Sequence, residues 1–448
     1  MKVHIVVHHF PPRHVGGAEL RAYNLASWLA RNGHHVQVTC IESVEEPSCG
    51  QGISWADEIY DGLAVRRIHY NIHAWPEPIR WTYDFPALEA HYRQAFDDER
   101  PDLVHLVSGY LQGVAPLRVA RALGIPAVVT LTDFWFLCPT IELLRADHEL
   151  CWRPEPAQCV RCWLNRWRPI HWAETHIPAI TRAGVALLNR MDWPLPALRR
   201  AHDAFAERPR VLLDELNRAH AIHCITKFLA SVYQANGVRP ELLRVVSYRD
   251  NDRTTAPRFA MTAPPQAVRF GYFGAVAHHK GIETLIRAFR RVPDRRGSQL
   301  HVFGVIRPPS YEARLRRLIG DDADIHLHGR YERDQLPELM SQVDVVVVPS
   351  IWHENAPRVI IEAFTHGCPV IGSDVGGIAE LVEDGVNGLV FKRNDADALA
   401  QAMQQLISTP ELIPQFRQRI PSLRLGDPEV EAVYAIYQEV LRHHGTRA

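Results

Sequence analysis

Residues 343–362 decide the fold class, and they read VDVVVVPSIWHENAPRVIIE. The uninterrupted valine run at 345–348 predicts a strand buried on both faces, since such a strand needs apolar side chains on both. Pro349 ends this strand, and a helix follows with Asn355 as its predicted N-cap and Pro357 tolerated in the first turn. A buried strand followed directly by a helix is the repeating unit of a parallel α/β sheet.

The same alternation occurs in two series along the chain. The first predicts strands at 3–7, 35–41, 103–107, 127–131, 221–225 and 243–247, and the second at 268–273, 300–303, 325–327, 343–348, 369–371 and 388–391. Residues 249–266 between them contain Pro257, Pro264 and Pro265 and show no periodicity, which is typical of a linker. The predicted fold class is α/β, with two Rossmann-like parallel-sheet domains facing a cleft.

The predicted first domain covers residues 1–248 and the second covers residues 267–425. An insert at about 133–206 interrupts the first domain, because Trp, Pro and Cys replace the strand–helix alternation there. Residues 426–448 predict a helix that packs back on the first domain.

Charge and hydropathy exclude several classes of protein. The 448 residues carry 50 Lys+Arg and 51 Asp+Glu, a formal net charge of −1, so no overall basic field attracts nucleic acid. No run of about 18 apolar residues is present for a membrane-spanning helix, and His8, His9 and Pro11 interrupt a signal-peptide core. We expect a cytoplasmic location.

Four loops with glycine or acidic residues follow predicted strands, at the edge where open α/β sheets bind ligands. Lys280 precedes a predicted helix, in the place where a phosphate rests on a helix N-terminus. Neither a Gly-Lys-Ser/Thr motif nor the G-x-G-x-x-G spacing is present. One such loop is compatible with a simple tight turn, but four together predict a phosphorylated or nucleotide ligand.

Glu354 and Glu362 flank the start of the predicted helix, the first just outside it and the second about two turns in. This spacing predicts contacts with different parts of one elongated ligand. The alternative is a solvent-exposed Glu354 and a surface ion pair at Glu362.

These motifs carry a resemblance. Residues 274–281, 349–362, 363–377, 380–382 and 385–390, together with the N-terminal loop at 16–19, resemble retaining family-4 glycosyltransferases of the GT-B architecture. The resemblance spans both domains and is weaker in the insert. It implies a hexosyltransferase of polysaccharide biosynthesis that moves a sugar with retention from a UDP- or GDP-sugar to a glycan, lipid-linked or small-molecule acceptor.

The resemblance also implies roles for individual residues. Glu354 would lie near the donor sugar, Glu362 would hold the ribose hydroxyls, and Lys280 would neutralise the diphosphate leaving group. No metal is then needed for catalysis. Asp133 would contact the donor sugar or the acceptor, from the acceptor-side first domain. The remaining expected donor-binding residues are Gly16, Gly17, Gly274, Asn355, Ala356 and Pro357.

Two positions depart from the family pattern. Ala275 stands where an arginine is usual, and Thr132 stands where a histidine often precedes the aspartate. His278, His279 or another arginine would have to supply the missing charge. Two alternative functions therefore stay open: a nucleotide-sugar 2-epimerase-like enzyme, and a catalytically silent nucleotide-sugar-binding protein.

The insert holds the cysteines Cys138, Cys151, Cys159 and Cys162. This spacing is compatible with a structural metal, most readily zinc, with buried free thiols or with disulfides. The insert also interleaves tryptophans with arginines, which fits either a small packed core with an arginine rim or a peripheral contact with the inner face of a membrane. The tryptophans are Trp152, Trp163, Trp167, Trp172 and Trp193, and the arginines are Arg153, Arg161, Arg166, Arg168, Arg182, Arg190, Arg199 and Arg200.

Overall fold

A computed structural model of the chain describes residues 1–190, 195–248, 259, 262–423 and 426–445. Most of the predicted linker at 249–266, and Trp193, lie outside the described residues. The chain divides into two compact units. The first contains Met1–Ile225, Leu229–Val246 and Leu425–Ala448, and the second contains Thr226–Phe228 and Ser247–Arg424.

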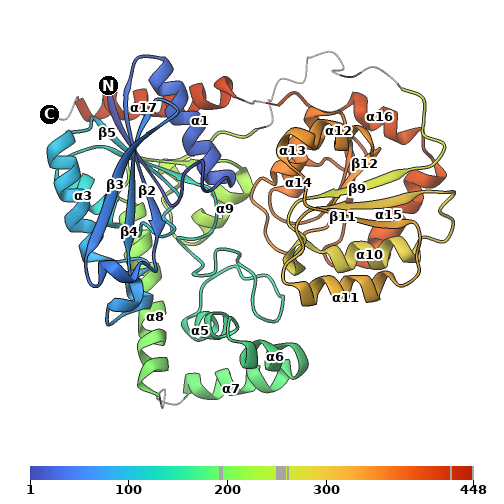
Figure 1. The fold of residues 1–448 in the computed structure, drawn as a ribbon, viewed down its shortest axis with the longest axis horizontal. Coiled ribbons are helices and arrows are strands. Elements are labelled where there is room, and N and C mark those ends of the chain that lie inside the picture. Colours follow the sequence, from blue (N-terminus) through green and yellow to red (C-terminus); the bar gives the residue numbers. More distant parts are fainter. Residues whose placement is uncertain (191–194, 249–258, 260–261, 424–425, 446–448) are drawn as a thin grey trace. The chain divides into compact units, whose positions relative to one another are not determined.

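The first unit is built on an eight-stranded sheet in the order β3-β4-β2-β1-β5-β6-β7-β8 (Figure 1). All neighbours are parallel except β3 and β4, which form an antiparallel hairpin. The strands are β1 Lys2–Val7, β2 His35–Ser43, β3 Ile53–Tyr60, β4 Leu63–Tyr70, β5 Leu103–Val107, β6 Ala127–Leu131, β7 Ala221–Cys224 and β8 Leu243–Val245.

Helices cover this sheet, and one of them comes from the end of the chain. The helix α17 (Asp427–Gly445) places Val433, Ile436 and Tyr437 in the same buried cluster as Leu25 and Leu29 of α1 (Gly17–Arg31). The other helices outside the insert are α2 Pro78–Trp81, α3 Pro86–Glu99, α4 Ala115–Ala122 and α9 Lys227–Ala235.

The described residues of the insert form four helices, and the last of them leads to the strand β7. They are α5 Pro156–Leu164, α6 Arg168–His176, α7 Pro178–Arg190 and α8 Pro196–Leu216. The buried cluster between α5 and α8 is small and contains Ala157, Cys159, Val160, Ala201 and Phe205. The insert therefore has little apolar core of its own.

The second unit is built on a six-stranded parallel sheet in the order β11-β10-β9-β12-β13-β14. The strands are β9 Arg269–Phe273, β10 Gln299–Phe303, β11 Ile325–Gly329, β12 Val345–Val348, β13 Val370–Ser373 and β14 Gly388–Phe391. The chain order reverses between β9 and β12, and a reversal of this kind opens a crevice at the carboxyl ends of the two strands. The loops after β9 and β12 are thus neighbours.

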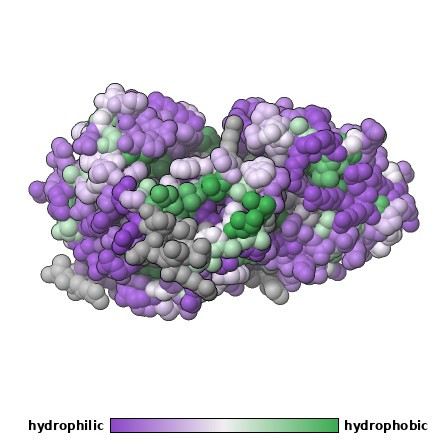
Figure 2. Space-filling model, turned by 90° about the horizontal axis from the view of Figure 1, so that it is seen from below, coloured by the Kyte–Doolittle hydropathy of each residue, from purple (hydrophilic) through white to green (hydrophobic). Residues whose placement is uncertain are grey.

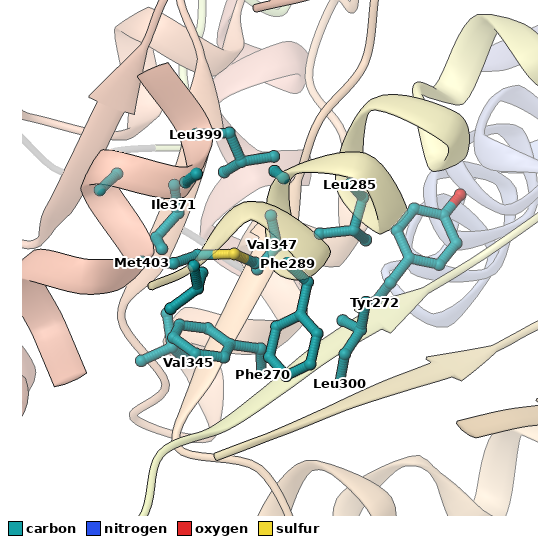
Figure 3. Packing of buried hydrophobic residues seen from close by; sticks show 14 of the residues in the cluster. Phe270, Tyr272, Leu285, Phe289, Leu300, Val345, Val347, Ile371, Leu399 and Met403 are labelled. Carbon is teal, nitrogen blue, oxygen red and sulfur yellow. The ribbon is translucent and has the colours of Figure 1, made fainter. Parts of the chain in front are cut away.

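The core of the second unit lies between this sheet and its helices (Figure 3). Val345 and Val347 of β12 point into it with Phe270 of β9, and Leu285 and Phe289 of α10 cover them. The helices are α10 Ile282–Arg291, α11 Pro309–Ile319, α12 Leu336–Ser341, α13 Arg358–Thr365, α14 Ile378–Leu381, α15 Ala396–Ser408 and α16 Leu412–Gln418. The predicted valine strand is confirmed, and its burial fixes the position of the loop that follows it.

Candidate functional site

Lys280 and Glu354 meet at the carboxyl ends of β9 and β12. The Lys280 Nζ donates to Glu354 Oε1 at 2.6 Å, and the same oxygen accepts from Ser350 Oγ at 2.7 Å and Trp352 Nε1 at 2.8 Å. The Lys280 ammonium also lies 4.7 Å from the centre of the Trp352 ring. Lys280, which we predicted to bind the diphosphate, and Glu354, which we predicted to lie near the sugar, are therefore paired with each other in this structure.

The Glu354 carboxylate is stabilised as an anion although its side chain is buried. Burial by itself raises the pKa of Glu354, but the charge of Lys280 and the three hydrogen bonds outweigh it and lower the pKa below its ordinary value. The alternative of a solvent-exposed Glu354 is therefore wrong.

His279 does not supply the charge that Ala275 lacks. Burial and the neighbouring Lys280 lower the pKa of His279 to about 4, so its ring is neutral at pH 7. Its edge faces the Trp352 ring at 5.1 Å between centroids.

The two loops are tied together through their backbones. The Ile351 amide donates to the His279 carbonyl at 2.9 Å. Gly281 has a φ of +74°, and a Cβ there would lie 1.8 Å from the Pro349 carbonyl oxygen. Only glycine permits this approach, which brings Lys280 next to Glu354.

The helix after Glu354 begins later than the sequence predicted. Arg358 is the first residue of α13 and Pro357 is its N-cap, without a side-chain cap. Asn355 as N-cap is therefore wrong, because Pro357 already adopts the extended conformation that precedes a helix. Asn355, Ala356 and Pro357 form the link between Glu354 and the α13 N-terminus.

Glu362 lies one turn into α13 and is about a quarter exposed. Its carboxylate is 3.7 Å from the Arg358 guanidinium, a weak contact of the kind expected for a surface ion pair. Burial is the main influence on Glu362 and raises its pKa, opposed by the charge of Arg358. Gly274 lies at the end of β9 in the loop that leads to Lys280.

The other predicted residues belong to the first unit. Gly16 precedes α1, and the space a side chain would take there is filled by the Glu19 carboxylate, whose Oε2 would be 2.4 Å from a Cβ. Apart from its chain neighbours and the backbone of its own helix, none of the described residues comes within 4 Å of a Cβ placed on Gly17. Of the two glycines, Gly17 is the one that leaves room for a ligand. Glu19 also contacts His8 Nε2 at 3.3 Å.

Asp133 follows β6, and its carboxylate is held in place by two hydroxyl groups and one backbone amide. It accepts from Ser108 Oγ at 2.8 Å, from Thr132 Oγ1 at 3.1 Å and from the Trp135 amide at 2.8 Å. Ser108 follows the neighbouring strand β5, so Asp133 bridges the ends of two strands.

The four insert cysteines are free thiols that line one small pocket of about 20 Å³. Burial raises the pKa of Cys162 to about 12, and it also raises the pKa of Cys151. Among the residues that the structure describes, no three His, Cys, Asp or Glu side chains are arranged to hold a metal ion. The thiols are thus brought together without forming a ligand set.

Family models match both units. Residues 267–409 match the model described as glycosyl transferases group 1, and residues 16–249 match the glycosyl transferase 4-like domain. The chain belongs to the group 1, family-4-like glycosyltransferases.

Characterised relatives of this glycosyltransferase chain match it over part of their length. It is 27% identical over 277 residues to D-inositol 3-phosphate glycosyltransferase of Rhodococcus erythropolis, covering 58% of this chain and 60% of that one. It is 26% identical over 230 residues to the lipopolysaccharide core biosynthesis glycosyltransferase LpsE of Rhizobium meliloti, covering 51% and 66%. The chain thus spans less than two thirds of both.

Solved structures share the fold of the whole chain. Anabaena Alr3699/HepE in complex with UDP has a TM-score of 0.60 at 18% identity, over 98% of this chain and 99% of that one. Sucrose-phosphate synthase of Thermosynechococcus elongatus has a TM-score of 0.57 at 18% identity, over 99% and 97%. These neighbours are GT-B glycosyltransferases, which confirms the predicted α/β fold class. Within the described residues, no helix is long and apolar enough to cross a bilayer.

Sequence reasoning missed Ser350 and Trp352, the two neutral donors to Glu354. One signal was available. A buried carboxylate needs several donors, and both residues lie within four positions of Glu354 in the same loop.

Proposed function

We propose that the chain transfers a hexose with retention from a nucleotide-diphosphate sugar to an acceptor hydroxyl. The observation that carries this proposal is the Lys280 ammonium, paired at 2.6 Å with a buried carboxylate at the crevice between β9 and β12. A cation at this point can bind a diphosphate. The solved complexes of Alr3699/HepE with UDP and with UDP-glucose support a UDP-sugar as donor, with a GDP-sugar as the alternative.

The reaction breaks the bond between the anomeric carbon and the phosphate oxygen, and forms a bond from that carbon to the acceptor oxygen on the same face. The acceptor proton passes to the departing phosphate. Lys280 opposes the negative charge that grows on the diphosphate, so its contribution is larger in the transition state than in the ground state. Glu354 holds Lys280 in place before the donor arrives and then contacts the sugar.

The other residues bind and orient the substrates. Two loops, one with Gly274 after β9 and one with residues 355–357 after β12, supply backbone groups to the sugar and phosphate, and Gly17 leaves space for the diphosphate. Asp133, fixed by three hydrogen bonds, orients the acceptor or the donor sugar. A glycan or lipid-linked acceptor is favoured by the relative LpsE, whose name refers to lipopolysaccharide core biosynthesis.

Donor turnover tests the proposal and separates it from its alternatives. UDP- and GDP-hexoses are incubated with the full chain, with and without glycan acceptors, and NMR reports the anomeric configuration of the product. Transfer with retention supports the proposal. Conversion of the donor sugar to its 2-epimer supports the epimerase, and tight donor binding without turnover supports the silent binding protein.

Glu362→Gln should weaken nucleotide binding by a factor of about 10 to 150. The contact of the carboxylate with Arg358 is long, at 3.7 Å, so the carboxylate is available to accept charge-assisted bonds from ribose hydroxyls, worth about 1.5–3 kcal/mol. Calorimetry with UDP and GDP measures the affinity, and thermal unfolding should change little. Asp397→Asn, on the exposed start of α15, is the control. An unchanged nucleotide affinity would remove Glu362 from the ribose site.

We also propose that the insert contacts an anionic membrane surface. Its exposed large apolar side chains include Trp152, Trp167, Trp172, Ile180 and Leu195, each more than half exposed. Figure 2 shows hydrophobic side chains, in green, gathered on the face seen from below. Exposed Arg153, Arg166, Arg182, Arg199 and Arg200 accompany them. Arg161 is buried and does not belong to this rim.

Vesicle sedimentation should detect this contact. We expect the full chain to bind vesicles that contain phosphatidylglycerol and to stay in solution with neutral vesicles, because each arginine near an anionic surface contributes about 1 kcal/mol. Trp167→Ala combined with Trp172→Ala should release it, whereas Trp55→Ala, on an exposed tryptophan of β3, should not. Equal binding to both kinds of vesicle would contradict the contact.

A further inference from the structure

Three separate segments bring the insert cysteines together. Cys138 lies in the loop after β6, and Cys151 follows a short bridge in which Leu144 pairs with Leu150. Cys159 and Cys162 lie one turn apart on α5, so both side chains face the same way. Their common pocket of about 20 Å³ has the size of a single water molecule or ion.

A buried arginine lies on α8, the helix that shares a buried cluster with the cysteine-bearing helix α5. Arg208 is 2% exposed, and its guanidinium packs on the Trp135 ring at 4.9 Å and donates through Nη2 to the Trp135 carbonyl. Burial lowers the pKa of Arg208, and Cys138 and Cys159 lie close enough to oppose that shift.

The Arg208 guanidinium has donors left over. Its Nε and Nη1 are buried and have no hydrogen-bond partner among the described residues. A buried cation with unused N–H groups is unfavourable unless a negative group lies next to it. Neutral thiols do not fill that role, whereas thiolates do.

We propose that Cys138, Cys151, Cys159 and Cys162 bind one zinc ion as a tetrathiolate site, and that Arg208 is its charge partner. Zinc replaces four S–H protons, which pass to solvent, and no electron is transferred. Four thiolates and Zn²⁺ carry a net charge of −2, which the Arg208 guanidinium reduces to −1. The ion supplies the cross-link that the small α5–α8 cluster lacks.

The four sulfurs must move closer to one another to form this site, since the described residues include no preformed set of metal ligands. The sulfurs of Cys138 and Cys151 turn to Thr140 Oγ1 and to the Arg153 carbonyl, both at 3.2 Å. Rotation of these side chains away from those two partners exposes both sulfurs to the shared pocket. The proposal is independent of the transfer reaction.

Elemental analysis of the full chain, purified without added metal, tests it. We expect about one zinc per chain in the wild type and in Cys368→Ser, which alters a buried free thiol of the second unit. Cys159→Ser should hold less than about 0.2 zinc per chain.

Zinc competition with a chromophoric chelator tests the role of Arg208. Arg208→Met should bind zinc about 10- to 100-fold more weakly, as is usual for groups that support metal ligands. Arg210→Met, on the exposed side of the same helix, should bind like the wild type. Equal affinity in Arg208→Met would show that the arginine is not the charge partner.

A measurement on the wild-type chain tests the proposal even where the cysteine variants fail to fold. After exchange into cobalt(II), tetrathiolate ligation gives intense visible absorption bands, and chelation should abolish them. Less than about 0.2 metal per chain with four titratable thiols overturns the proposal, as do two disulfides. Iron with acid-labile sulfide would assign an iron–sulfur cluster and also overturn it.

Discussion

Lys280→Met should lower turnover of the intact donor by a factor of about 30 to 900, which corresponds to about 2–4 kcal/mol of transition-state stabilisation. The second unit holds the Lys280 ammonium at the switch point of its sheet, and the adjacent His279 is neutral at pH 7. His279 therefore cannot replace the charge, and His278, the other histidine of the loop, is paired with the Glu283 carboxylate at 3.3 Å. Steady-state kinetics with saturating acceptor measure the effect, and Lys392→Met, an exposed lysine of the same unit, is the control.

The same substitution removes a partner of Glu354, so a loss of stability has to be separated from a loss of catalysis. Lys280→Met leaves the buried carboxylate with Ser350 and Trp352, and should destabilise the second unit by about 1–3 kcal/mol. Adding Glu354→Gln removes the unpaired charge and should recover stability without recovering turnover. A double variant with wild-type turnover would show that Lys280 acts only through Glu354.

The pH dependence of unfolding provides a second readout. The pKa of Glu354 is lowered in the folded chain, so its contribution to stability is full above its ordinary value of 4.5 and is lost as the pH falls through the lower folded value. In Lys280→Met the folded pKa rises, because burial is then opposed by fewer groups. The wild type should therefore lose more stability on acidification than this variant, in which the folded pKa of Glu354 lies closer to or above its ordinary value.

The sequence predicted the loops of the donor site because their positions follow from chain topology. A valine run that cannot face water has to be a central strand, and the loop after it opens at the carboxyl edge. Both Lys280 and Glu354 follow such strands in the sequence, so we predicted that they lie at this edge. Their pairing with each other was not predicted, since it depends on side-chain rotamers and on the Gly281 backbone, which periodicity does not report.

The β3–β4 hairpin was missed for a different reason. Its strands follow β2 directly and break the strand–helix alternation on which the prediction relied. The local signal was present in Asp61 and Gly62, which both have positive φ and make the two-residue turn. The helix start at Arg358 was misplaced because Asn355 is a strong N-cap by residue type, and the conformation of Pro357 took precedence.

Arg161→Met should destabilise the insert by about 3–5 kcal/mol, the cost of removing one partner of a buried ion pair. Arg161 and Glu174 are 3% and 2% exposed, and they are joined by two bonds of 2.6 and 2.5 Å. Arg161 also donates to Asp147 at 3.2 Å. The substitution would leave the Glu174 carboxylate buried with Thr181 as its hydrogen-bond donor.

Hydrogen exchange can localise the loss, since the ion pair joins α5 to α6 and the apolar cluster of the insert is small. Amides of α6 and α7 should lose protection in Arg161→Met, while those of β9 and β12 in the second unit keep theirs. Arg161→Met combined with Glu174→Met should regain much of the protection, because two apolar side chains of similar volume leave no unpaired charge. The control is Arg166→Met, which changes an exposed arginine just beyond α5 and should exchange like the wild type.

If α6 and α7 keep their protection in Arg161→Met, the ion pair is not what anchors them, and the cross-link proposed at the four thiols must hold the insert on its own.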